Sequence, residues 1–88
     1  MTYEVIIHQK VAKQIKDLPE SHQQEVARLL NILEYIAIPF TEFDIKKIKG
    51  KAYTYRVRFG DYRLIYELNK KENKIQILKL KPRKKAYK

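Results

Sequence analysis

The stretch YTYRVRFGDYRLIY, residues 53–66, constrains the fold of this chain more than any other. Apolar and polar residues alternate with a period of two on both sides of Gly60-Asp61, and this is the pattern of two β-strands. A two-residue loop that begins with glycine is typical of a type II′ turn. The sequence therefore predicts a β-hairpin whose register is fixed by this turn.

The predicted register gives the hairpin two different faces. One face is apolar and aromatic, and its cross-strand pairs are Phe59 with Tyr62, Val57 with Leu64, and Tyr55 with Tyr66. On the other face Arg58 lies opposite Arg63, and Arg56 lies beside this pair, opposite Ile65. Like charges directly opposite each other destabilise a sheet. Selection for stability alone would not place them there, so we expect an anionic ligand on this face.

The charge of the chain supports this expectation. Residues 1–45 contain four Lys or Arg and seven Asp or Glu, giving −3, whereas residues 46–88 contain sixteen and three, giving +13. Such asymmetry indicates nucleic acid or another polyanion as partner. A lysine-rich surface that reflects base composition alone is the alternative. Only five of the twenty basic residues are arginines, and four of these lie in the basic half, where a rigid bidentate fork suits phosphate.

Composition excludes several other classes of protein. The chain has no cysteine, hence no disulfide and no thiolate metal site. No apolar run approaches the roughly 20 residues of a membrane span. The start, MTYEVIIHQK, lacks the basic region of a signal peptide. We expect a single cytoplasmic domain spanning residues 1–88.

Candidate metal ligands and acid–base pairs are scarce. His8 and His22 have no metal-ligating neighbour at helical or strand spacing, which favours ordinary surface or core-edge roles. The acids of the basic half are Asp61, Glu67 and Glu72, too dispersed for a two-carboxylate site. The sequence therefore predicts no metal and no cofactor.

The remaining elements follow from periodicity. A first strand is predicted over residues 2–8 and a short helix over residues 10–18. A second helix, ended by Pro39, carries the apolar stripe Val26, Leu29, Leu30, Leu33, Ile36 and Ala37. Residues 40–51 are predicted to be a loop that Ile48 anchors.

The last predicted strand covers residues 74–81. Its apolar residues change phase between Ile77 and Leu78, so this strand is either buried on both faces or bulged. Together the elements predict an α+β fold, in which two N-terminal helices pack on a mainly antiparallel four-stranded sheet in the order β-α-α-β-β-β.

This order of elements, the loop FDIKKIKG, the hairpin YRVRFGDYRLIY and the ending LKLKPRKKAYK together resemble the RelE/ParE superfamily of toxins of type II toxin–antitoxin systems. The archaeal RelE branch is the most similar. The resemblance implies a RelE-like fold and a metal-independent, ribosome-dependent endoribonuclease that cleaves mRNA in the A site by attack of a 2′-hydroxyl. It also implies the ribosome, mRNA and a RelB-like antitoxin as partners, the antitoxin in a heterotetramer, and no membrane.

The resemblance further assigns roles to residues. The implied catalytic residues are Arg56, Arg58, Arg63, Arg83 and Tyr87. Arg83 would stabilise the transition state, and Tyr87 would stack on the substrate or orient it. The lysines expected to bind RNA are Lys46, Lys47, Lys49, Lys51, Lys81, Lys84 and Lys85. For the four lysines of residues 46–51, a solvated turn is the alternative.

One departure from the family concerns the general base. In the best-known branch lysines occupy the positions of Arg56 and Arg58, and one of them has been proposed as the base. Arginine stays protonated and cannot accept a proton. A base would then be Tyr87, a deprotonated lysine such as Lys49, Lys51 or Lys84, or a group on the ribosome.

Two alternatives from other functional classes remain at this stage. One is a ParE-like toxin that binds gyrase and cleaves no RNA. The other is a non-catalytic RNA-binding module that uses the same basic face.

Overall fold

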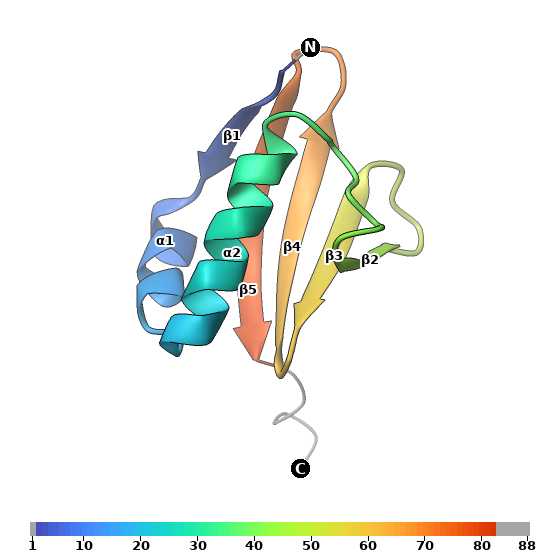
Figure 1. Ribbon diagram of the computed structural model, residues 1–88. Coiled ribbons are helices and arrows are strands. Elements are labelled where there is room, and N and C mark those ends of the chain that lie inside the picture. Colours follow the sequence, from blue (N-terminus) through green and yellow to red (C-terminus); the bar gives the residue numbers. More distant parts are fainter. Residues whose placement is uncertain (1, 83–88) are drawn as a thin grey trace.

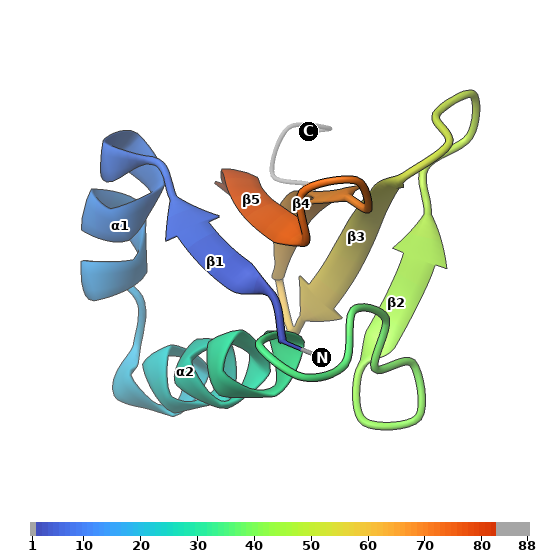
Figure 2. The same cartoon turned by 90° about the horizontal axis from the view of Figure 1, so that it is seen from above.

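A computed structural model describes residues 2–82 of the 88-residue chain. In order, its elements are β1 (Glu4–Ile7), α1 (Gln9–Lys16), α2 (Glu20–Leu33), β2 (Asp44–Lys47), β3 (Thr54–Phe59), β4 (Tyr62–Asn69) and β5 (Lys74–Pro82). The strands form one sheet in the order β1-β5-β4-β3-β2. Helix α2 crosses one face of this sheet and α1 lies at the β1 side (Figures 1 and 2). No described helix covers the opposite face, which we call the helix-free face. The predicted α+β class is confirmed.

The β3–β4 hairpin has the predicted register at every pair. Val57 pairs with Leu64, and Arg58 pairs with Arg63. Gly60 has φ of +54°, and Asp61 does not share this positive φ. A positive φ at the first loop residue alone is the type II′ pattern. The turn therefore sets which side chains point to the core and which point to the helix-free face.

The predicted sheet was wrong in detail, because the sheet has five strands instead of four and one of its pairings is parallel. Residues 40–51, predicted to be a loop, contain β2, which pairs antiparallel with β3. This edge strand has only Ile45 directed to the core, opposite Val57. Four residues with one inward apolar side chain show no detectable period, so the pairing depends on β3. The sheet is also mixed, because β1 pairs in parallel with β5.

Helix α2 ends earlier than its apolar stripe predicted. It stops at Leu33, and Ile36 is exposed. The backbone N–H groups of Glu34 and Tyr35 donate to carbonyls three residues back, which tightens the last turn. Beyond Leu33, hydrogen bonds from the sheet side replace those of the helix. The Tyr3 N–H donates to the Glu34 carbonyl, and the Tyr66 hydroxyl donates to the Ala37 carbonyl, at 2.7 Å each.

The phase change in β5 is a bulge. Ile65 pairs with Lys79 and Tyr66 pairs with Ile77, so Leu78 is the extra residue. Before the bulge Ile77 is buried, and after it Leu80 is buried. Ile77 and Leu80 are three residues apart, and the extra residue allows both to face the core. Burial on both faces, the other possibility, does not occur.

One hydrophobic core joins the helices to the sheet. Its buried members are Val11, Leu18, Val26, Leu29, Leu33, Tyr55, Val57, Phe59, Leu64, Tyr66, Leu68, Ile75, Ile77 and Leu80. Burial, and secondarily the proximity of Tyr55, raises the pKa of the Tyr66 phenol well above its usual value. Neither helix has the length and apolarity that crossing a membrane requires.

Replacing Gly60 should destabilise the hairpin for two separable reasons. A non-glycine residue at positive φ costs roughly 1–2 kcal/mol. In addition, a Cβ at this position would lie 2.9 Å from His22 Cε1. We expect Gly60→Ala to lower the free energy of unfolding by more than Gly50→Ala, because Gly50 has φ of +82° with nothing within 4 Å. Chemical denaturation measures both.

A double-mutant cycle with His22→Ala separates the steric part. The cost of Gly60→Ala should fall in the His22→Ala background to about that of Gly50→Ala. Equal costs for Gly60→Ala in both backgrounds would contradict the contact with His22.

Candidate nucleic-acid interface

A row of charged side chains crosses the helix-free face at its hairpin end. Strand register places Asp44, Arg58, Arg63 and Lys81 side by side on β2, β3, β4 and β5. Directly opposite residues in a sheet have Cβ atoms about 4.5–5.5 Å apart. Three adjacent cations therefore lie in one line, with a single carboxylate at its end. We call these four residues the first row.

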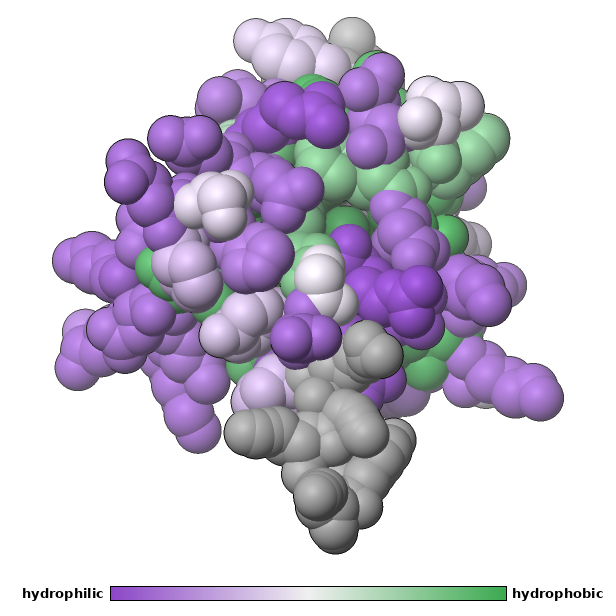
Figure 3. All heavy atoms as spheres, turned by 60° about the horizontal axis from the view of Figure 1, so that its bottom comes forward, coloured by the Kyte–Doolittle hydropathy of each residue, from purple (hydrophilic) through white to green (hydrophobic). Residues whose placement is uncertain are grey.

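A second row lies one alternation further along the strands. It consists of Lys46, Arg56, Ile65 and Lys79. The two rows together present six cationic side chains and one carboxylate. The second row thus widens the first into a basic surface. Figure 3 shows the neighbouring hairpin end with the helix-free face turned away, and there the described residues are largely hydrophilic around an apolar patch.

Asp44 is the counter-charge that the fold supplies. Its carboxylate lies 3.2 Å from Arg58 Nε and 3.7 Å from an Arg56 terminal nitrogen. Each of these ion pairs is partly exposed, and exposed pairs contribute about 0.2–1 kcal/mol. No ion pair within residues 2–82 engages Arg63. The middle of the first row is therefore the least neutralised part of the surface.

Two guanidinium nitrogens of these rows are buried without a hydrogen-bond partner among the described residues. They are the Nε atoms of Arg56 and Arg63. An unsatisfied buried donor costs about 1–3 kcal/mol, and more when it is charged. An anion bound to these side chains from the solvent side would offset part of this cost, since charge-assisted hydrogen bonds are the strongest kind. The chemistry of this surface is suited to an anion such as phosphate.

Comparison with known proteins identifies the family. Residues 5–87 match the family described as the ParE toxin of the type II toxin–antitoxin system parDE. A protein of Methanocaldococcus jannaschii named RelE1 is 40% identical over 88 residues, which are 100% of this chain and 98% of that protein. The chain belongs to the RelE/ParE toxin family. The resemblance drawn from the sequence is thereby confirmed.

Solved structures of archaeal relatives support the same family and fold. A chain of the archaeal RelE–RelB complex from Pyrococcus horikoshii is 46% identical, with a TM-score of 0.84 over 94% of this chain and 97% of that one. The RelB–RelE antitoxin–toxin complex from Methanococcus jannaschii gives 25% identity and a TM-score of 0.78, covering 93% and 94%. The two helices and five strands described above are thus a RelE-like fold.

The toxin brings together some of the residues singled out from the sequence and separates others. Arg56, Arg58, Arg63, Lys46 and Lys81 share the two rows. Lys47 pairs with Tyr55 in register and so points to the helix side of the sheet edge.

Other predicted residues lie elsewhere. Lys49 and Lys51 lie between β2 and β3, at the end of the sheet away from the hairpin turn. Arg83, Lys84, Lys85 and Tyr87 lie outside the described residues. Their predicted roles therefore stay predictions.

Two charged members of the rows were not predicted as site residues. Asp44 was not predicted as a site residue because residues 40–51 were predicted to be a loop, which has no defined face. Lys79 and Lys81 both follow the bulge, which puts the two of them on the same face as Arg56. The alternation of Lys79, Leu80 and Lys81 was the signal that could have revealed Lys79.

The histidines have local contacts and no metal-like neighbourhood. His22 makes an edge contact with the Tyr62 ring, with centroids 5.4 Å apart, and bonds to Glu25 at 3.2 Å. His8 bonds to Gln76 at 3.3 Å. Within residues 2–82 there is no group of three or more His, Asp or Glu side chains that could hold a metal ion.

Neutralising Asp44 should strengthen RNA binding and weaken the fold. Asp44→Asn removes the counter-charge from Arg56 and Arg58, so we expect tighter binding of single-stranded RNA in dilute salt. The free energy of unfolding should fall by about 0.2–1 kcal/mol per lost pair. Fluorescence anisotropy and chemical denaturation measure the two effects.

Glu42→Gln is the matched control. Glu42 pairs with Arg28 at 3.1 Å on the helix side and is similarly exposed. This variant should lose stability on the same scale with unchanged RNA affinity. An Asp44→Asn protein that binds RNA more weakly would contradict the electrostatic account.

Proposed function

We propose that this toxin is a ribosome-dependent endoribonuclease that cleaves mRNA in the A site. The observation that carries the proposal is the line of Arg58, Arg63 and Lys81, adjacent on three strands and, among residues 2–82, neutralised only at one end. A rigid sheet presents these cations, and the described residues hold no carboxylate cluster beside them. Such a surface suits the phosphates of a bound RNA strand.

The chemistry follows from the charge that develops in the reaction. The 2′-oxygen attacks the adjacent phosphorus, the bond from phosphorus to the 5′-oxygen breaks, and the products are a 2′,3′-cyclic phosphate and a 5′-hydroxyl. The phosphorane-like transition state carries an additional negative charge on its non-bridging oxygens. Preorganised guanidinium groups are most effective where charge develops. In this proposal Arg63, flanked by Arg58, contacts those oxygens.

Proton transfer cannot use the arginines, because a guanidinium remains protonated. A base must also lie within hydrogen-bond reach of the attacking hydroxyl. Lys49 and Lys51 lie at the far end of β3, which argues against them as the base. Tyr87, Lys84 and a ribosomal group remain, and ribosomal positioning of the mRNA would supply much of the rate enhancement.

Arg83 is proposed as the main stabiliser of the transition state, with Tyr87 orienting the substrate. β5 ends at Pro82, opposite Tyr62 and next to Lys81 of the first row. The described chain thus leaves the sheet beside the arginines. Proline restricts the backbone at this exit.

A RelB-like antitoxin is the proposed partner, in a heterotetramer. The archaeal relatives are seen in complexes with RelB. An antitoxin that is acidic where it meets the basic rows would neutralise them. Tyr35, Ile36 and Phe40, exposed after α2, offer apolar surface to an extended partner.

A second function is favoured by one finding. The matched family is described as the ParE toxin, so a toxin that binds gyrase and cleaves no RNA is the alternative. A purified supercoiling assay, run in parallel with mRNA cleavage, distinguishes the two.

Cleavage of ribosome-bound mRNA tests the proposal. The full-length chain, mixed with programmed ribosomes, should cut the mRNA at codon-related positions and leave cyclic or 3′-phosphate ends. Exchange of Mg²⁺ for other ions that keep ribosomes intact should not abolish cutting. Arg83→Ala should slow single-turnover cleavage on saturated ribosomes by about 10²–10³-fold, as loss of one preorganised donor does, and Arg63→Ala should slow it by a smaller factor.

Arg28→Ala is the matched control, because Arg28 lies on α2 and pairs with Glu42. It should cleave at the unmutated rate. Intact mRNA together with gyrase inhibition would move the toxin to the ParE-like function. If Arg83→Ala weakens ribosome binding and leaves saturated cleavage unchanged, Arg83 is an affinity residue.

A further inference from the structure

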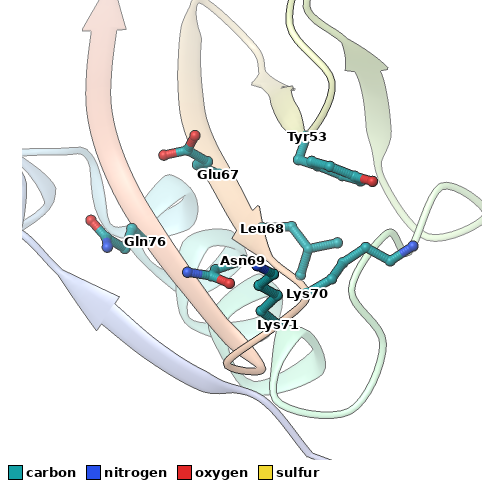
Figure 4. A pocket seen from close by; sticks show the side chains of 7 residues that line it. All are labelled: Tyr53, Glu67, Leu68, Asn69, Lys70, Lys71 and Gln76. Atoms are coloured by element: carbon teal, nitrogen blue, oxygen red, sulfur yellow. The ribbon is translucent and has the colours of Figure 1, made fainter.

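A pocket of about 410 Å³ lies beside the β4–β5 turn, at the end of the sheet away from Gly60-Asp61 (Figure 4). It is lined by Tyr53, Glu67, Leu68, Asn69, Lys70, Lys71 and Gln76. Its volume falls within the roughly 300–1,000 Å³ typical of small-molecule sites. None of these residues belongs to the two basic rows, and the proposed function gives them no role.

The pocket combines an exposed aromatic ring with polar side chains that line its other side. Tyr53 is 45% exposed, so its ring is accessible to a ligand. Glu67 and Gln76 are directly paired on β4 and β5 and line the opposite side (Figure 4). No hydrogen bond or ion pair within residues 2–82 engages the Glu67 carboxylate. The Gln76 amide oxygen bonds to His8, so its amide nitrogen is available as a donor.

We propose that this pocket binds one base of a single-stranded RNA, stacked on Tyr53 and read at its edge by Glu67 and Gln76. Single-stranded bases are recognised in this way, by aromatic stacking together with hydrogen bonds to the base edge. Lys70 and Lys71, at the rim, supply cations for the neighbouring phosphates. The carboxylate of Glu67 selects bases with an exocyclic amino group, such as cytosine, over uracil, which has none.

The Tyr53 ring already has a neighbour, and the balance favours the base. Lys70 Nζ lies 5.4 Å from the ring centroid. An exposed cation–π contact of this kind is worth about two- to fivefold in an equilibrium constant. Stacking of a base is worth about 5- to 150-fold. A base can therefore displace the ammonium group, which then turns to a phosphate.

The pocket extends the proposed RNA surface along the sheet. Glu67 follows Arg63 by four residues on β4 and points to the same face, about 13 Å away at the usual rise per residue. One RNA strand can therefore lie across the rows and reach the pocket. The inference rests on RNA being the ligand, as the proposed function states, but it does not require that the RNA be cleaved.

Binding of two short RNAs to the full-length chain tests the proposal. The probes are single-stranded hexanucleotides of cytidine and of uridine, measured by fluorescence anisotropy in dilute salt. Tyr53→Ala should weaken binding of the cytidine probe at least fivefold, whereas Tyr53→Phe, which keeps the ring, should bind like the unmutated chain. Tyr35→Ala is the matched control, because Tyr35 is an exposed tyrosine after α2, and it should change affinity less than twofold.

Discrimination between the probes tests the reading of the base edge. The unmutated chain should prefer the cytidine probe by about fivefold or more, and Glu67→Ala should bring the ratio close to one. Equal affinity of Tyr53→Ala and the unmutated chain, a ratio unaffected by Glu67→Ala, or no RNA binding at all would overturn the pocket. RNA binding that depends on Tyr53, without mRNA cleavage on ribosomes, would instead overturn the proposed nuclease and leave the pocket standing.

Discussion

The register of the β3–β4 hairpin is the constraint on which the rest of this toxin depends. Side chains alternate between the faces of a strand, so a shift by one residue would send Arg56 and Arg58 into the core and Val57 to the solvent. The turn at Gly60-Asp61 prevents this, with Gly60 at positive φ beneath the His22 ring. The same register that buries the aromatic face lines up the arginines on the other.

Magnitudes explain why this register tolerates repulsion. Fully burying a large apolar side chain contributes about 1.5–3 kcal/mol, and β3 and β4 bury several, among them Val57, Leu64 and Tyr66. A like-charge pair opposite each other costs only about 0.2–1 kcal/mol. Burial of the core therefore determines the register, and it outweighs the repulsion between Arg58 and Arg63. We interpret this cost as retained for phosphate binding, as expected where function and stability compete.

The elements that sequence could predict are those with local determinants. The hairpin pairs follow from a period of two around one glycine. β2 could not be found, because residues 44–47 have one inward apolar residue and form a strand only against β3. The parallel pairing of β1 with β5 joins the two ends of the chain, and no local signal encodes it. The apolar stripe predicted a longer α2 than the structure has, since the carbonyls of Glu34 and Ala37 accept hydrogen bonds from Tyr3 and Tyr66.

The site was predictable to the same degree. Arg56, Arg58 and Arg63 follow from the hairpin register alone. The counter-charge Asp44 required the edge strand, which is a tertiary feature, whereas the alternation of Lys79, Leu80 and Lys81 already indicates that the two lysines share a face. Lys49 and Lys51 were grouped with the arginines by composition, but topology puts them at the opposite end of β3. Charge content thus indicates a polyanion, whereas strand order decides which cations act together.

The most direct test of this account is the coupling free energy between Arg58 and Arg63 in the free protein. It is obtained from the unfolding free energies of Arg58→Gln, Arg63→Gln and the double variant in dilute salt. The account predicts that Arg63→Gln is more stable than the unmutated chain by about 0.2–1 kcal/mol, that this gain shrinks when Arg58 is already replaced, and that the variant binds RNA more weakly. Arg28→Gln, which loses the pair with Glu42, should gain no stability. A loss of stability in Arg63→Gln, with a favourable coupling between the two arginines, would show that the first row stabilises the fold, and would contradict the account.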